Sequence, residues 1–223
     1  VVTIDSESCP SPGIFKTTLP EGYVLADGTN VLSLTVALSA GSSEGTSSYA
    51  DSDTLTNVTY YDADGTPKTC QSATKVTNTP DVEGGNTITW GKPGMTTWYA
   101  VNNSHLTIGD SADKWTIYVK GDVHLIMMQG SWLCMTGRIE VLPGNSLTIY
   151  CDNTSNSGKL QAWYTQGGNA SIGGSAESPD SGTITINSGS VSASSSGSGA
   201  GIGSGEGGSA GDITINGGII DAK

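Results

Sequence analysis

One segment near the end of the chain occurs twice, and this repeat constrains the fold more than any other feature. The sequence Gly-Thr-Ile-Thr-Ile-Asn at residues 182–187 returns as Gly-Asp-Ile-Thr-Ile-Asn at residues 211–216, a step of 29. A second pair lies beside it, Ala-Ser-Ile-Gly-Gly-Ser at residues 170–175 and Ala-Gly-Ile-Gly-Ser-Gly at residues 200–205. Self-similarity at a fixed period of this size is typical of stacked supersecondary units, not of one irregular globule.

The segments before the repeat contain short runs in which apolar and polar residues alternate, as in half-buried strands. Residues 123–127 align with residues 147–151 at a step of 24. Coils of about 24–30 residues with three short strands each predict a right-handed parallel β-helix, in which inward-facing apolar residues stack on their equivalents one coil away. Asn187 and Asn216 follow equivalent strands, which predicts an asparagine ladder at a corner. A β-sandwich is the alternative, because many short strands with turns suit it too, but a sandwich has no reason to repeat its sequence.

Residues 1–58 lack the repeat. A solenoid needs its exposed ends covered, so we predict an N-terminal β cap or small β subdomain over residues 1–58 and the parallel β-helix over residues 59–223. Residues 31–38 alternate apolar and small side chains and are predicted to form a strand. Residues 57–70 are predicted to form a hairpin that turns at Asp64-Gly65. The two acids in the turn lack the distal Glu and the spaced oxygen ligands of a calcium loop, which favours a plain turn.

Composition and charge restrict the partners of the chain. It has 223 residues, a formal net charge of −12 and nine basic residues. Phosphate binding needs clustered Lys and Arg, so we expect neither nucleic acid nor an anionic membrane surface as a partner. The acidic, Ser- and Thr-rich composition fits a secreted protein. The sequence has neither a signal peptide nor an apolar run long enough to cross a bilayer, so we expect a mature or excised segment without membrane insertion.

The four cysteines, Cys9, Cys70, Cys134 and Cys151, match no zinc-binding spacing. One or two disulfides and buried thiols are both consistent with the sequence. Cys151 shares the parity of the apolar residues before it and is predicted to face the core.

From about Tyr60 to Lys223 the chain resembles the glycine-rich β-helix repeat modules of large bacterial cell-surface proteins. The segments that carry the resemblance are Tyr61–Cys70, Trp98–Asn102, Gly121–Ile126, Gly144–Tyr150, Ala200–Gly203 and Ile213–Gly218. The resemblance implies an extracellular location, secreted or attached to the cell wall. It also implies adhesion or glycan binding, because such modules are called adhesin-like or carbohydrate-binding by analogy. The chain departs from the pattern at residues 130–135 and 164–170.

Aromatic residues near the irregular corners are the candidate ligand-binding residues. These are Trp132, Trp163 and Tyr164. Exposed aromatic faces stack on sugar rings, and neighbouring coils would array them along a groove. The alternative is that Trp132 and Trp163 cover the core or a loop. His105 and His124 are interpreted as ordinary residues, with His124 on the outer face in a solvated position.

Pectin lyases and polygalacturonases share the β-helix fold, which raises the question of catalysis. Glycoside hydrolysis needs paired carboxylates on one strand face, and the predicted strands carry no such pair. A lyase site would need a basic residue, but Arg138, Lys120 and Lys159 fall on different coils.

We therefore predict a non-catalytic surface module for adhesion or glycan binding, without catalytic residues, metal or cofactor. Its expected partners are a polysaccharide or host glycan and the other domains of the same surface protein. A rigid structural spacer is the first alternative and a polysaccharide-degrading β-helix enzyme the second.

Overall fold

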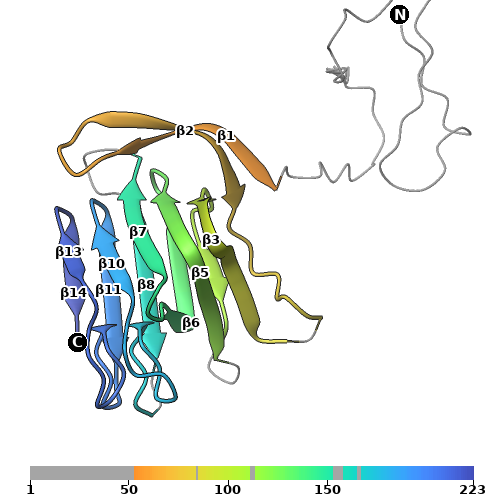
Figure 1. Ribbon diagram of the computed structural model, residues 1–223. Coiled ribbons are helices and arrows are strands. Elements are labelled where there is room, and N and C mark those ends of the chain that lie inside the picture. Colours follow the sequence, from red (N-terminus) through yellow and green to blue (C-terminus); the bar gives the residue numbers. More distant parts are fainter. Residues whose placement is uncertain (1–52, 84, 111–113, 153–157, 165–166) are drawn as a thin grey trace, which may run out of the picture. The chain divides into compact units, whose positions relative to one another are not determined.

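The described part of the chain is an all-β solenoid. The computed structural model describes residues 53–223 except for residues 84, 111–113, 153–157 and 165–166. This part has fourteen strands and no helix, and its stacked parallel coils form a β-solenoid of about five turns (Figure 1). The predicted parallel β-helix is confirmed. The β-sandwich is excluded, because every strand pairing after the first hairpin is parallel.

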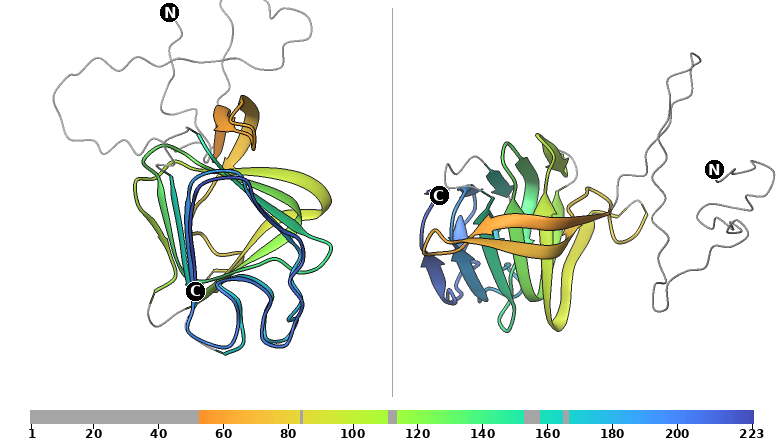
Figure 2. Two further views of the ribbon diagram at one scale, coloured as in Figure 1. Left: turned by 90° about the vertical axis from the view of Figure 1, so that its left-hand side faces the viewer. Right: turned by 90° about the horizontal axis from the view of Figure 1, so that it is seen from above.

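Each coil contributes to three parallel sheets, which we call faces 1, 2 and 3; Figure 2 (left) looks along the stack. Face 1 consists of residues 87–91 of β3 (Thr87–Val101), residues 115–120 of β5 (Trp115–Met127), residues 137–140 of β6 (Trp132–Glu140), β9 (Ile172–Gly173) and β12 (Ile202–Gly203). Face 2 consists of residues 96–101 of β3, residues 122–127 of β5, β7 (Ser146–Cys151), β10 (Thr183–Ile186) and β13 (Ile213–Ile215). Face 3 consists of β4 (Leu106–Ile108), residues 132–136 of β6, β8 (Lys159–Tyr164), β11 (Ser190–Ser195) and β14 (Ile219–Ala222).

The pairing register follows the alignments made from the sequence. Residues 123–127 pair with residues 147–151, and residues 184–186 pair with residues 213–215. The Nδ2 of Asn216 donates to Oδ1 of Asn187 at 2.7 Å, which confirms the asparagine ladder. Inward positions stack through the coils and form one continuous core. Its largest fully buried residues are Trp90, Ile108, Ile117, Leu125, Met127, Leu133, Met135, Ile139, Leu147, Ile149 and Leu160.

Coil length varies more than the alignments of the sequence predicted. Thr183 pairs with Ser146, a step of 37, and Ile172 pairs with Ile139, a step of 33. The predicted range was too narrow because the additional residues lie in the connections between strands, where they do not disturb the parallel register.

The predicted hairpin is present and lies outside the coils, except that its residues 74 and 75 pair in parallel with residues 99 and 100 at the edge of face 2. β1 (Thr54–Tyr61) and β2 (Pro67–Lys75) are antiparallel, and Gly65 in their turn has φ +76°. Oδ1 of Asp62 accepts the N–H of Ala63, and Oδ1 of Asp64 accepts the N–H of Thr66. These contacts identify a plain turn, as predicted.

The hairpin runs along the stack of coils (Figure 2, right) and packs on the outer side of face 2. A small apolar cluster, separate from the core of the coils, joins the hairpin to face 2. It consists of Val58, Cys70 and Ala73 from the hairpin and Ala100, Ile126 and Tyr150 from face 2. The apolar outer residues of face 2 are therefore covered by the hairpin and not by water.

The structure bears on one feature of the predicted division into residues 1–58 and 59–223, namely the position of the boundary. The boundary predicted at residue 58 falls inside β1. The predicted cap lies almost entirely outside the described residues, as does the strand predicted for residues 31–38, and both stay predictions.

Cys70, Cys134 and Cys151 are free thiols, and Cys9 lies outside the described residues. The predicted core-facing position of Cys151 is confirmed, because this residue is fully buried. Among the described cysteines, the alternative of buried thiols therefore holds for Cys70 and Cys151, whereas Cys134 is half-buried on the outside of face 3.

Gly121, where β5 turns from face 1 to face 2, provides a test of the coil geometry. Its φ is +75°, and an added Cβ would lie 2.2 Å from the carbonyl oxygen of Lys92. Gly144 is a matched control, because its φ is +81° but no atom lies within 4 Å of an added Cβ. We expect Gly121→Ala to lower the free energy of unfolding by about 3 kcal/mol or more, and Gly144→Ala by about 1 kcal/mol. Urea unfolding followed by far-UV circular dichroism measures both, and equal losses would contradict the close backbone contact.

Candidate functional site

Trp163 is the most open of the candidate residues. It is the single exposed residue among the five tryptophans, all of which are described, with 43% of its surface accessible. The alternation in β8 explains this exposure, since Leu160 and Ala162 point into the core and the odd positions point outward. In the ladder of face 3, Trp163 lies between Thr136 and Ser194. Both neighbours are much smaller than an indole, so the ring stands above the surface around it.

Trp132 lies on the same face but at its other end. It pairs with Lys159, whereas Trp163 pairs with Thr136. Four strand positions and one coil separate the two tryptophans, which amounts to roughly 14 Å. The ring of His105 stacks on Trp132 with centroids 4.3 Å apart and planes 7° apart, so one side of this indole is covered. The structure therefore places both tryptophans on one face without bringing them together.

The surface between the two tryptophans consists of small, uncharged side chains. The outward positions of neighbouring strands fall in register here. They are occupied by the half-buried residues Cys134, Thr136, Gln161, Ser192 and Ser194. Face 3 thus presents a flat strip of hydroxyl, thiol and amide groups with an aromatic ring at each end.

Tyr164 follows Trp163 in the chain but points into a different environment. The Arg138 guanidinium lies over its ring, 5.7 Å from the centroid. Nη2 of Arg138 is 2.9 Å from Oε2 of Glu140, and Nη1 donates to Oδ1 of Asn169. Arg138 and Glu140 are largely buried, so each charge needs the other. Tyr164 is therefore fixed at the corner between faces 3 and 1.

The Arg138–Glu140 pair was not predicted from the sequence. A signal for it existed, because residues two apart in a strand share one side of the sheet. Arg138 is also the only arginine in the chain. The contact with Asn169 had no such signal, since it joins residues 31 positions apart.

A second polar cluster lies on the outside of face 2. Nε2 of His124 is 3.0 Å from Oδ2 of Asp122, and Nδ1 of His124 is 2.9 Å from the hydroxyl of Tyr150. The hydroxyl of Ser146 donates to Oδ1 of Asp122 at 2.5 Å. The ring of Trp98 stacks on His124 with centroids 4.2 Å apart. These contacts connect β3, β5 and β7, which lie on three successive coils.

The outward parity predicted for His124 is confirmed, but its solvated role is wrong. The side chain is 16% exposed, because Trp98 covers its ring and Tyr150 and Asp122 bind its two nitrogens. Asp122 lies two residues before His124 in the same strand, but only the pairing of neighbouring coils brings Trp98 and Tyr150 to it.

The order of hydrogen bonds in this cluster argues for a structural role. The carboxylate of Asp122 stands between the Ser146 hydroxyl and the His124 imidazole, so His124 does not contact Ser146 as a general base contacts a nucleophile. Burial, together with the nearby charges of the hairpin and Asp122, raises the pKa of Tyr150, which keeps this hydroxyl neutral. The cluster can therefore tie coils together but lacks an activated nucleophile.

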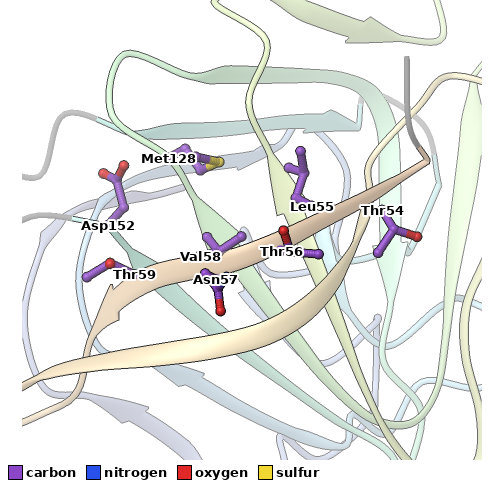
Figure 3. Close-up of a pocket in the computed structure, with 8 residues that line it drawn as sticks. All are labelled: Thr54, Leu55, Thr56, Asn57, Val58, Thr59, Met128 and Asp152. Atoms are coloured by element: carbon purple, nitrogen blue, oxygen red, sulfur yellow. The ribbon is translucent and has the colours of Figure 1, made fainter. Parts of the chain in front are cut away.

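A cavity of about 490 Å³ lies between the hairpin and the corner of the coils (Figure 3). Six consecutive residues of β1, Thr54–Thr59, line it together with Met128 and Asp152. Burial raises the pKa of Asp152. Nothing in the sequence pattern indicated this cavity, because it depends on how the hairpin lies on the coils.

No group of three or more His, Cys, Asp or Glu side chains in the described part of the chain is placed to hold a metal ion. Between residues 53 and 223, the described segments include no helix long and apolar enough to cross a membrane.

Asp122 gives a pH-dependent test of the face 2 cluster. Burial acts to raise its pKa, but hydrogen bonds from Ser146 and His124 and the charge of His124 outweigh it and hold the pKa below its usual value. The ionised form therefore stabilises the fold above about pH 4, and this contribution is lost as the pH falls through the lowered pKa.

We expect Asp122→Asn to lower the urea midpoint at pH 7 and to lower it less at about pH 2.5, where more of Asp122 is protonated. Asp221→Asn removes an exposed carboxylate of β14 and serves as the control, with little effect at either pH. An Asp122→Asn loss of the same size at both pH values would contradict the assignment.

Comparison of the chain with known protein families, with curated proteins and with solved structures finds no match.

Proposed function

We propose that this chain is a non-catalytic module of a bacterial cell-surface protein, located outside the cell, that binds a glycan on face 3. The observation that carries the proposal is the exposed indole of Trp163 on a flat, regular sheet. Exposing a large apolar ring to water is unfavourable, and such rings on rigid surfaces often serve binding.

The surroundings of Trp163 suit a sugar ring. The indole offers a flat apolar face, and Thr136, Gln161 and Ser194 provide hydroxyl and amide groups within the same ladder. These neighbours are uncharged, so we propose a neutral glycan. The β-solenoid holds them rigidly, which lowers the entropy lost on binding.

The other two candidates have different parts in this proposal. Trp132 has one side covered by His105 and can offer only its opposite side or its edge to a ligand. Tyr164, held by Arg138, forms the border of the surface beside Trp163. A glycan chain that reaches from Trp163 to Trp132 would cross the polar strip between them.

A rigid spacer within a larger surface protein is the second candidate. The observation that favours it is the continuous apolar core, which extends from Val76 to Ala193 independently of any surface site. Both functions are compatible with the fold, and they differ in whether face 3 binds anything.

Trp163→Ala is the decisive variant. We expect a glycan array to identify neutral ligands, and isothermal titration calorimetry to show at least about tenfold weaker binding for Trp163→Ala, equivalent to about 1.4 kcal/mol. Trp132→Ala is the matched control on the same face, with a smaller effect on affinity and a measurable loss of stability from the lost His105 stacking.

Three other outcomes would change the proposal. Unaltered affinity of Trp163→Ala would refute the site on face 3. No binding to any glycan would favour the spacer. Release of reducing sugars or unsaturated uronates from a polysaccharide would instead establish an enzyme.

A further inference from the structure

The first strand of the described chain, β1, stands at the edge of the sheet. Its partner strand is β2, and no strand in the described segments pairs along its opposite side. The strand has the sequence Thr-Leu-Thr-Asn-Val-Thr-Tyr-Tyr, without the Lys or Pro residues that commonly prevent pairing at a sheet edge. Its backbone is therefore a template onto which another strand could add.

The cavity described above lies along this strand. Six consecutive residues of β1 line it, so a stretch of backbone about 20 Å long borders one side. Met128 and Asp152, at the corner that follows β5 and β7, form the opposite side, as Figure 3 shows. A volume of about 490 Å³ that extends along a strand suits an extended chain better than a compact ligand.

Asn57 gives a second, independent observation. It has φ +54°, and it is the one residue of β1 without a register partner in β2. Asparagine tolerates this conformation better than most residues, but it remains strained. The regular pairing of the hairpin is therefore interrupted at Asn57. Such local strain is characteristic of ligand-binding segments.

The charge of the cavity indicates which side chain the added strand would carry. Asp152 is the only charged residue among those that line it. Burial of this carboxylate raises its pKa by more than the backbone hydrogen bonds of Gln129 and Asp152 lower it, so its ionised form is destabilised in the unliganded protein. A Lys or Arg side chain in the cavity would offset that cost by pairing with Asp152. Leu55, Val58 and Met128 would contact the aliphatic part of the same side chain.

We propose that the cavity beside β1 binds an extended peptide, which adds to the edge of β1 and places a Lys or Arg side chain against Asp152. Backbone hydrogen bonds along Leu55–Thr59 would provide affinity, and Asp152 would provide selectivity. This inference is independent of the proposed glycan binding, because face 3 and the cavity share no residue that either proposal uses.

The test uses the full chain and three short fluorescein-labelled peptides. One peptide alternates Thr and Val around a central Lys. The second has Glu in place of Lys, and the third keeps Lys but is N-methylated at alternate positions, which removes backbone donors. By fluorescence anisotropy we expect the Lys peptide to bind at least about tenfold more tightly than the Glu peptide, and N-methylation to abolish binding.

Two variants test whether the charge of Asp152 causes the preference for Lys. Asp152→Asn keeps the size of the side chain and is expected to remove the preference for Lys over Glu. Asp64→Asn removes an exposed carboxylate in the hairpin turn, outside the cavity, and is expected to leave the preference unchanged. With the Lys peptide bound, amide hydrogen exchange at residues 55–59 should slow at least about tenfold, as expected for strand addition.

Three results would overturn the proposal. They are equal binding of the N-methylated peptide, a Lys preference that survives Asp152→Asn, and no anisotropy change with any of the three peptides.

Discussion

In-register stacking of inward-facing apolar residues is the interaction on which the rest of this structure depends. Leu147 pairs with Val123 in the preceding coil and with Ile184 in the following one, and all three are fully buried. A short strand such as β10 could not stay folded alone, since it buries apolar surface only between two neighbouring coils. The parallel ladder aligns equivalent residues, and the buried side chains make that alignment favourable. Each coil therefore supports the next.

The same constraint explains where the molecule tolerates irregularity. Connections of different length join coils whose strands remain in register, so the additional residues gather outside the three faces. Outward side chains are likewise free to differ from coil to coil, because they do not contribute to the core. This freedom produces clusters as different as His124 with Asp122 and Tyr150 on face 2, and Arg138 with Glu140 near Tyr164. Outer surfaces that differ from coil to coil are thus built on one regular core.

The hairpin adds a contact that the coils themselves do not require. Ile126 and Tyr150 point outward from face 2, yet they are buried, because Val58 and Cys70 of the hairpin cover them. This arrangement removes apolar groups from water and leaves a cavity where β1 diverges from the corner of the coils. The apolar cluster under the hairpin and the polar cluster around His124 consequently share Tyr150.

Sequence periodicity by itself determined the solenoid, the register of the coils whose segments recur in the sequence, the asparagine ladder and the hairpin turn, because each follows from local spacing and the period of a strand. It also placed Trp163 near an irregular corner, but it did not decide between an exposed ring and one that covers the core or a loop. Only the tertiary structure decided that His105 covers Trp132, that Arg138 holds Tyr164, and that His124 is enclosed. These contacts join residues on different coils, or on a strand and the loop beside it. A strand's alternation shows which side a residue faces, but the residue it meets there depends on coil length and on how the hairpin packs.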